Sequence, residues 1–288
     1  MSNYWQNRML NAQDILREKT VKQTEKQLAK YYRQTMKSVI AEFEAVYDKL
    51  LATIEDGKEP TVADLYKLNK YWEMQGQLRN ELQKLGELEV LTISNNFINQ
   101  WQHVYKITEQ DLVAYFNARA EVDPENIHPL SWPPEAHFNT ISTDKAEQMI
   151  NQVWCADGKS WSDRVWNNID DLAATLNEKL VECVVSGKKT TELKKELQHR
   201  FNVSYSRADT LVRTETSHIQ TQATAQRYKD YGLEKYEILG RKEEDGCHHS
   251  PDCSDMDGKT FLYSEMIVGV NAPPFHPNCR CNIIPVID

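Results

Sequence analysis

The chain has 288 residues, which is long enough for two domains and a sizeable hydrophobic core. It carries 34 basic and 43 acidic residues, for a net charge of −9, so the whole molecule is not a polycation of the kind that coats nucleic acid. Polar residues follow Met1 without a signal-peptide pattern, and no apolar run approaches the length of a membrane span. We therefore expect a protein made in the cytoplasm that has no membrane partner.

The first 56 residues contain neither Gly nor Pro, and their apolar positions have a helical period. Apolar residues recur at intervals of three or four at Leu28, Tyr32, Met36, Val39, Phe43, Val46, Leu50 and Ile54. Charged and amide side chains such as Lys26, Lys30 and Arg33 fill the opposite face. This pattern predicts one long amphipathic helix. It is either an ordinary member of a helical bundle or a projecting arm that docks on a partner protein.

Further helices are predicted up to residue 120. Asp56–Gly57 ends the first helix, and Thr61–Asp64 resembles a capping box that opens a helix reaching about Gly86. A third helix has its apolar side between Leu88 and Tyr105, and Thr108–Asp111 resembles the cap of a short fourth one. Residues 1–120 are therefore predicted to form a helical N-terminal domain.

A Pro-rich stretch marks the predicted domain boundary at residues 121–141, because four prolines fall within eleven of its residues. Helical patterns return in residues 142–288. Starts are predicted at Ser142–Thr143, Ser162–Asp163, Thr190–Thr191 and Ser204 or Ser206, and ends at Gly187, Arg200–Phe201 and Tyr231–Gly232. Tyr236–Leu239 is predicted to be a strand.

The charge balance inverts between Lys188 and Lys242, where 12 basic and 7 acidic residues give a net charge of +5. Such a stretch can contact phosphates, which would make weak, sequence-independent DNA binding possible. It can equally form the solvated faces of two helices. The second interpretation is favoured because no aromatic residues interleave for base stacking.

Glu215 is predicted to lie on a core-facing side of its helix, four residues from both Leu211 and Ile219. A carboxylate in a core must be paired or protonated. Arg213 is two positions away and faces elsewhere, so Arg164 on another helix is the candidate partner. An internal ion pair is favoured over a catalytic role, because no companion base or nucleophile is evident nearby.

The segment 240–288 concentrates thiol and imidazole groups, with four of the six cysteines and three of the eight histidines. Between its two Cys/His clusters, Asp257–Gly258 is a dipeptide typical of tight hairpin turns, and the β-prone residues Thr260–Tyr263 follow. The two clusters would then converge on a segment too short to bury its own core. Small zinc modules are built in this way.

The preferred zinc ligands are Cys247, Cys253, His276 and one of Cys279 or Cys281. The spacing differs from that of the common zinc ribbon. Two alternatives remain, in which these residues are buried reduced thiols or form disulfides in an oxidising compartment.

Several motifs occur in an order that resembles a known family. They are Trp161-x2-Arg164-Val165-Trp166, Gly187–Thr190, Leu211–Thr216, Asp245-x-Cys247, Asp257–Lys259 and Pro273–Cys281. Residues 142–288 are thereby similar to the head-morphogenesis domain of minor capsid proteins of tailed bacteriophages, the Mu F-like group. Members often carry a C-x2-C pair before the Asp-Gly turn, whereas Cys247 and Cys253 are separated here by five residues, with His248 and His249 as possible substitutes.

The resemblance implies a low-copy virion protein of the phage head. Its implied partners are the portal protein and the major capsid protein, and its implied roles are head assembly, DNA packaging or delivery. The expected fold is mainly α, with a helical N-terminal domain and an α+β C-terminal domain ending in a small Cys/His-rich β-hairpin module. The alternative is a zinc-stabilised nuclease of the HNH type with His248 or His249 as the base, but the required downstream metal-binding helix is not evident.

Overall fold

A computed structural model describes residues 2–54, 58, 60–122, 142–240 and 251–287 of the chain. It consists of two compact units. The first unit comprises Met1–Thr24, Ile93–Trp161 and Thr210–Asp288, and the second comprises Glu25–Thr92 and Ser162–Asp209. Each unit therefore combines segments from both sides of the Pro-rich stretch. The predicted boundary at residues 121–141 stays a prediction, because residues 123–141 lie outside the described part.

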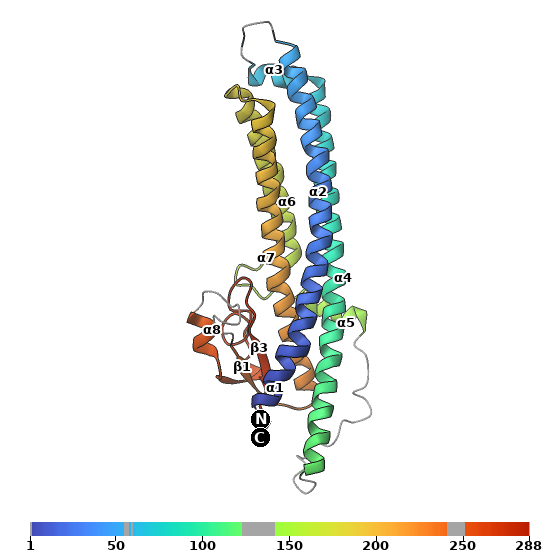
Figure 1. Cartoon of the computed structure of the whole chain (residues 1–288), viewed down its shortest axis with the longest axis vertical. Coiled ribbons are helices and arrows are strands. Elements are labelled where there is room, and N and C mark those ends of the chain that lie inside the picture. The colour runs from blue at the N-terminus through green and yellow to red at the C-terminus, as the bar shows by residue number, and fades with distance from the viewer. Residues whose placement is uncertain (1, 55–57, 59, 123–141, 241–250, 288) are drawn as a thin grey trace. The chain divides into compact units, whose positions relative to one another are not determined.

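The second unit is a bundle of four helical segments (Figure 1). The segments belong to α2 (Asp14–Ala52), α4 (Asn69–Val122), α6 (Trp161–Val185) and α7 (Thr190–Asp230), and the short α3 (Val62–Lys67) precedes α4. Most of the apolar positions predicted for the first long helix are buried here, from Leu28 to Leu50. This part of α2 is thus an ordinary bundle helix, as its amphipathic pattern predicts. The Thr61 capping box is also confirmed.

The sequence-based prediction of three helices between residues 61 and 120 is wrong in its boundaries, because α4 runs without a break from Asn69 to Val122. Gly86 lies inside this helix. A Cβ atom there would come within 2.5 Å of the Trp166 ring, so Gly86 permits close packing against α6. Thr108 is also interior to α4, where its hydroxyl donates to the Val104 carbonyl at 2.8 Å. Similarly, α7 passes through Arg200 without ending.

The first unit contains the small sheet. Its elements are α1 (Ser2–Arg8), the π-helical turn Met9–Gln13, α5 (Thr143–Ile150), β1 (Lys235–Leu239), α8 (Pro251–Met256), β2 (Thr260–Leu262), the 3-10 turn Tyr263–Glu265 and β3 (Asn282–Pro285). The strand order is β2-β1-β3, and both pairings are antiparallel. Tyr236 of β1 lies opposite Phe261 on one side and Pro285 on the other.

The Asp257–Gly258 turn connects α8 to β2, and Gly258 has a positive φ of 74°. The Asp257 carboxylate accepts a hydrogen bond from the Gly240 N–H at 2.8 Å, which holds this turn against the end of β1. The predicted fold class is confirmed. The chain is mainly helical, and a small sheet and a Cys/His group lie near its C-terminal end.

Aromatic side chains dominate the apolar core of the first unit. The Trp5 ring lies 5.2 Å from that of Tyr115, and the Tyr236 and Tyr263 ring centroids are 5.0 Å apart. These contacts join α1, α4 and the sheet in one core. None of the helices in the described part of the chain combines the length and the apolar character that a membrane span requires.

Candidate metal centre

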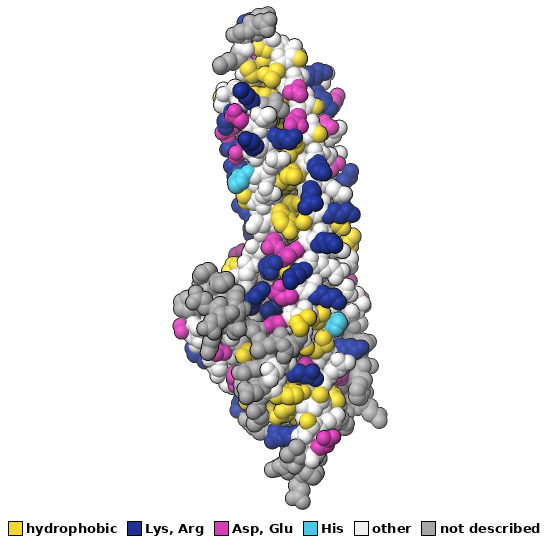
Figure 2. Space-filling view, in the orientation of Figure 1, with side chains coloured by type: hydrophobic (Ala, Val, Ile, Leu, Met, Phe, Trp, Pro, Cys, Tyr) yellow, Lys and Arg dark blue, Asp and Glu magenta, His cyan; other side chains and the backbone are white. Residues whose placement is uncertain are grey.

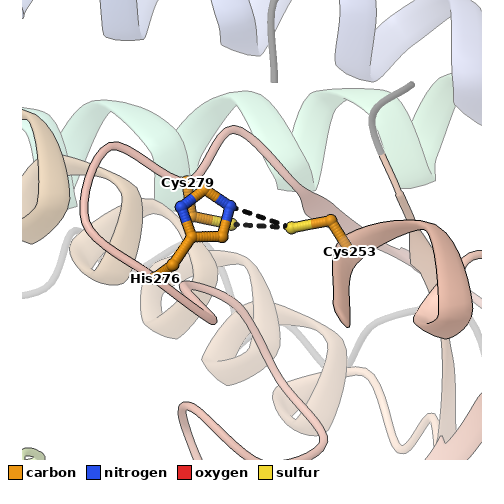
Figure 3. A group of neighbouring side chains, drawn as sticks. All are labelled: Cys253, His276 and Cys279. Carbon is orange, nitrogen blue, oxygen red and sulfur yellow. Dashed lines mark hydrogen bonds between the residues drawn. The ribbon is translucent and has the colours of Figure 1, made fainter. Parts of the chain in front are cut away.

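Three potential ligands of one metal ion lie together in the first unit (Figure 3). Cys253 comes from α8, whereas His276 and Cys279 come from the loop that leads to β3. The Cys253 Sγ atom is 3.1 Å from His276 Nε2 and 3.8 Å from Cys279 Sγ, and all three ligand atoms lie within 4.8 Å of one another. Two segments about twenty residues apart thus supply a thiol–imidazole–thiol group.

The spacing of these atoms fits tetrahedral zinc. With Zn–S bonds of about 2.3 Å and Zn–N bonds of about 2.0 Å, bound S···S and S···N pairs are separated by about 3.8 Å and about 3.5 Å. The observed Cys253–Cys279 separation of 3.8 Å matches the first value, and Cys253–His276 at 3.1 Å needs only a small outward movement. The described cysteines are free thiols, including Cys253 and Cys279. The donor set therefore fits a thiophilic cation.

A tight turn brings His276 and Cys279 to the same side. The Cys279 N–H donates to the His276 carbonyl at 3.1 Å, and Asn278 adopts a positive φ of 62°, which asparagine tolerates better than most residues. His276 Nδ1 is 2.8 Å from the Pro277 carbonyl oxygen. A carbonyl only accepts, so this contact assigns the proton to Nδ1 and leaves the Nε2 lone pair facing the thiols, as a metal ligand requires.

Cys281 lies next to these three residues but is not part of the group whose ligand atoms all lie within 4.8 Å of one another. It is completely buried and packs in one cluster with Cys253 and Cys279. Hydrogen bonding with the thiols of Cys279 and then Cys281, together with burial, raises the pKa of the Cys253 thiol well above its usual range. The Cys253 thiol therefore resists ionisation on its own. A bound cation would reverse this preference, because it stabilises thiolates directly.

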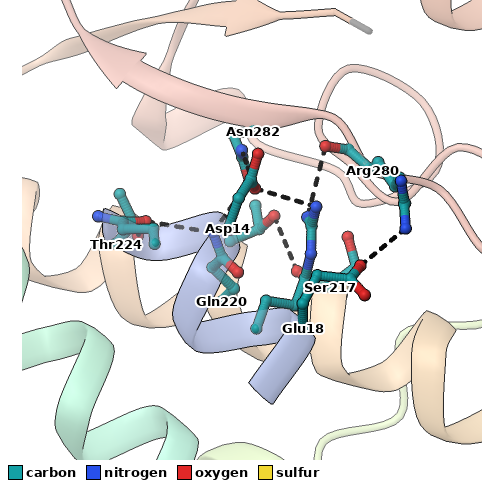
Figure 4. Close-up of polar contacts among 10 residues, drawn as sticks. Asp14, Glu18, Ser217, Gln220, Thr224, Arg280 and Asn282 are labelled. Atoms are coloured by element: carbon teal, nitrogen blue, oxygen red, sulfur yellow. Dashed lines mark hydrogen bonds and ion pairs between the residues drawn. The ribbon is translucent and has the colours of Figure 1, made fainter. Parts of the chain in front are cut away.

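A polar network joins the Cys279–Cys281 segment to the start of α2 (Figure 4). Arg17 forms an ion pair with Asp14 at 2.9 Å and donates to the Arg280 carbonyl at 3.4 Å. Asn282 donates to the same Asp14 carboxylate at 3.0 Å, and Arg280 pairs with Glu18 at 2.8 Å. Burial lowers the pKa of Arg17 to about 10, so its guanidinium stays charged at neutral pH. The loop carrying two of the thiols is thereby held on both sides of Cys281.

Comparison with known families identifies this part of the chain. Residues 174–284 match the family model described as Phage Mu protein F like protein. The chain carries a Mu F-like C-terminal domain. The matched range contains α7, β1, β2, all but the last residue of β3, and Cys253, His276, Cys279 and Cys281. No curated protein and no solved structure matches the chain in the corresponding searches.

The structure places some of the predicted metal ligands of the Mu F-like domain together, whereas others lie outside the described residues. The structure brings Cys253, His276 and Cys279 together and places Cys281 in the same cluster. Cys247 lies outside the described residues, as do His248 and His249, so their participation stays a prediction. Of Cys279 and Cys281, between which the sequence leaves the choice open, Cys279 is the one whose Sγ lies in a group with the ligand atoms of Cys253 and His276, and the participation of Cys281 stays a prediction.

Glu215 is buried in the Mu F-like domain with 3% exposure, and its carboxylate accepts a hydrogen bond from the Trp154 indole N–H at 2.9 Å. One helical turn away, the His218 ring stacks on Trp154 with a centroid distance of 4.8 Å. Burial lowers the pKa of His218 to about 3, so this histidine is neutral at physiological pH. Arg213 is half-buried, and the pairing of Glu215 with Arg164 stays a prediction.

Part of the basic stretch from Lys188 to Lys242 is neutralised by ion pairs within the described residues. Five of its cations form ion pairs: Lys188–Glu182, Lys194–Glu44, Arg200–Glu196, Arg207–Asp171 and Arg227–Glu109. These pairs fit the interpretation of this stretch as helix faces rather than as a phosphate-binding surface.

Two residues that support the centre are missed in the sequence analysis. Arg17 precedes Val21 by four residues and continues the buried face of α2, so extending the helical period backward from Leu28 would have indicated its burial. Thr214, whose hydroxyl accepts from the Asn278 N–H at 3.1 Å, has no comparable signal, because the contact depends on how the loop meets α7.

Proposed function

We propose that this protein is a minor head protein of a tailed bacteriophage. In this proposal it is a low-copy component of the virion, made in the host cytoplasm, that acts in head assembly, DNA packaging or DNA delivery. The observation that carries the proposal is the match of residues 174–284 to the Mu F-like family. The matched range includes the metal centre and all of the sheet except Pro285.

The proposed partners are the portal protein and the major capsid protein. Long helices with exposed polar faces offer extended surfaces of the kind that protein partners use. In the first unit the C-terminal loop is hydrogen-bonded to α2 through Arg17 and Arg280 and to α7 through Thr214, which should restrict its motion. Such a surface loses little entropy on binding, which favours assembly into a particle.

We further propose that the centre binds one structural zinc ion through Cys253, His276, Cys279 and Cys281, with Cys247 as the alternative fourth ligand. Four protein donors would close the coordination sphere, and closed sites stabilise folds rather than activate water. The zinc would join α8 to the loop before β3. It would thus cross-link the two halves of a segment with few regular elements of its own.

A binding role is proposed in preference to catalysis. The buried titratable groups of the described residues that stand out, Glu215 and His218, lie against Trp154 inside the core rather than in an open pocket. A nuclease of the HNH type would need an accessible base beside a metal-bound phosphate. Plasmid DNA incubated with the protein and Mg²⁺ or Mn²⁺ should therefore remain intact.

Co-expression with the portal protein of the same phage tests the proposed role. The tagged portal protein should retain this protein through purification in about 0.15 M salt, where weak charge contacts are screened. The portal protein of an unrelated phage serves as the control. Retention by neither portal protein, or equal retention by both, would contradict a specific portal association.

A further inference from the structure

The solvent-facing side of α2 in the second unit carries a row of cations. Lys26, Lys30, Arg33 and Lys37 are all exposed. At about 3.6 residues per turn they fall within an arc of about 60°, opposite the buried positions Leu28 and Val39. We call these four residues the α2 basic face. Figure 2 shows Lys and Arg side chains following one another over this helix.

None of these four cations forms an ion pair with a residue in the described part of the chain. Several other cations of the second unit are paired. Lys70, Lys194, Arg200 and Arg207 each pair with an acidic side chain within 3.3 Å. The one acidic residue among residues 26–37 and their immediate neighbours is Glu25, which is half-buried. In a chain of net charge −9, the α2 basic face is thus a local concentration of uncompensated positive charge.

We propose that the α2 basic face binds the phosphate backbone of double-stranded DNA without reading its sequence. Lys26 and Lys37 are eleven residues apart, which spaces the four cations by about 5.5 Å on average along about 16 Å of helix axis. Duplex DNA presents about one phosphate per 3.4 Å along each strand. The two spacings are of the same order, so several phosphates can be neutralised at once.

The chemistry of the face favours duplex DNA over other partners. The exposed residues beside the cations are amides such as Gln27 and Gln34, which can donate to phosphate oxygens. An apolar anchor of the kind that dominates protein interfaces is not present among these exposed residues. Single-stranded nucleic acid would call for exposed aromatic rings for base stacking, and the face has none.

This inference rests on the proposed function for its occupant, since duplex DNA is the polyanion that fills a phage head. It also relocates the expected DNA contact. The Lys188–Lys242 stretch has the higher number of cations in the sequence, but many of them are paired in the folded protein. Lys22 and Lys19 continue the same helical spacing backward along α2 within the first unit.

The test compares two quadruple variants of the full chain that lose the same charge. One replaces the α2 basic face (Lys26→Gln, Lys30→Gln, Arg33→Gln, Lys37→Gln), and the control replaces paired cations (Lys70→Gln, Lys194→Gln, Arg200→Gln, Arg207→Gln). Binding to a fluorescent random-sequence duplex of about 30 base pairs is measured by anisotropy from about 50 to 300 mM salt. Circular dichroism checks that both variants remain folded.

The first variant should lose at least about tenfold in affinity at low salt, with a salt dependence reduced by about three ions, whereas the control should stay within about threefold of wild type. Equal losses in both variants would overturn the inference, since net charge alone would then explain binding. Failure of the wild-type protein to bind at about 50 mM salt would also overturn it. Competition by polyglutamate as effective as by DNA, at equal charge, would assign the face to an acidic protein instead.

The test of DNA binding and the test of the proposed function can fail independently of each other. Binding is measured on purified protein and needs no virion, whereas incorporation into heads is measured independently by mass spectrometry. The first variant should enter heads at the wild-type level. Absence of the wild-type protein from virions would contradict the proposed function while leaving the binding result in place.

Discussion

The two units differ in what fills their interiors. In the second unit the α2, α4, α6 and α7 segments bury mostly apolar side chains, and a single acid, Glu89, is completely buried. The first unit buries many polar groups, including Arg17, Gln220 and Arg227, together with the Cys/His cluster. Similar long helices therefore run through two interiors of different chemistry.

The handling of buried charge shows the difference most clearly. In the first unit Arg17 is paired with Asp14, and Arg227 with Glu109 at 3.0 Å. In the second unit the Glu89 carboxylate accepts from the Tyr32 hydroxyl at 2.9 Å, and burial raises its pKa to about 7. Paired charges demand specific geometry, whereas a protonated acid can sit in an apolar bundle. Substitutions in the first unit should therefore have larger consequences.

The largest effect is expected at the metal centre. Cys253→Ser should reduce zinc content from about one ion per chain to near zero and destabilise the first unit by at least about 4 kcal/mol, a fraction of the roughly 10–16 kcal/mol of structural zinc binding. Metal analysis and thermal unfolding measure both effects. Cys155→Ser, the same chemical change outside the cluster, should retain the metal.

Cys281→Ser then sharpens the ligand assignment. If Cys281 is the fourth ligand, this variant should lose zinc as Cys253→Ser does. Full zinc content in Cys281→Ser would point to Cys247 as the fourth ligand. Protein purified without chelators that contains no metal, with unchanged stability in both variants, would contradict the zinc proposal.

The next effect concerns Glu215. Glu215→Ala should destabilise the first unit by about 2–4 kcal/mol, because the Trp154 N–H and the other groups that face the carboxylate lose a buried partner. Glu215→Gln keeps an oxygen acceptor for Trp154 and should lose less. Chemical denaturation monitored by Trp fluorescence gives both values. A change below about 0.5 kcal/mol in Glu215→Ala would mean that the carboxylate is solvated.

Glu89 provides the corresponding test in the second unit. Its folded pKa of about 7 lies above the ordinary value of 4.5, so the folded state binds a proton more tightly than the unfolded state. The contribution of Glu89 to the free energy of unfolding therefore falls as pH rises from 4.5 to about 7, and it stays at its lowest value above that range. Glu89→Gln should be more stable than wild type by on the order of 1–3 kcal/mol at pH 8 and should lack this pH dependence. Denaturation curves of Glu89→Gln and of the wild-type protein are measured at pH 5 and pH 8. The same difference in free energy of unfolding between the two proteins at both pH values would contradict the prediction.

The smallest effects are expected at two glycines of α4 in the second unit. Gly76 has no atom within 4 Å of a built Cβ, so Gly76→Ala should stabilise the helix by about 0.5–1 kcal/mol. Gly86→Ala should instead destabilise by about 1–2 kcal/mol, because its Cβ meets the Trp166 ring at 2.5 Å. Thermal unfolding of the two variants should shift in opposite directions. Stabilisation by both substitutions would contradict the prediction for Gly86→Ala, because it would show that the Trp166 side chain moves aside without loss of stability.

The periodicity of the sequence predicts most helices but not where they continue. In the sequence, Gly86 indicates a helix end, yet the helix continues through it. Its missing Cβ makes room for Trp166, and this contact depends on another helix. Thr108 reads as a cap, yet its hydroxyl bonds within the helix and accepts from the buried amide of Gln13 at 3.2 Å. Tertiary packing decides both positions, and local preference cannot report it.

The potential ligands of the candidate metal centre can be predicted from the sequence more readily than the residues that hold them in place. Clustering of Cys with His indicates the donors, since these residue types seldom gather without a metal or redox role. The turn at Asn278, which brings Cys279 to the same side as His276, could not be anticipated from the spacing of the Cys and His residues. Arg17 lies more than 250 residues away in the chain, so only the fold reveals its contact with the Arg280 carbonyl.

Quantitative mass spectrometry of purified particles tests the central claim most directly. Procapsids, mature virions and virions that have released their DNA are compared with heads assembled without this gene. We predict a few copies per particle in all three preparations, with peptides from both units present in equal amount, and none in the heads assembled without the gene. Absence of the protein from both procapsids and mature virions would contradict the assignment to the phage head.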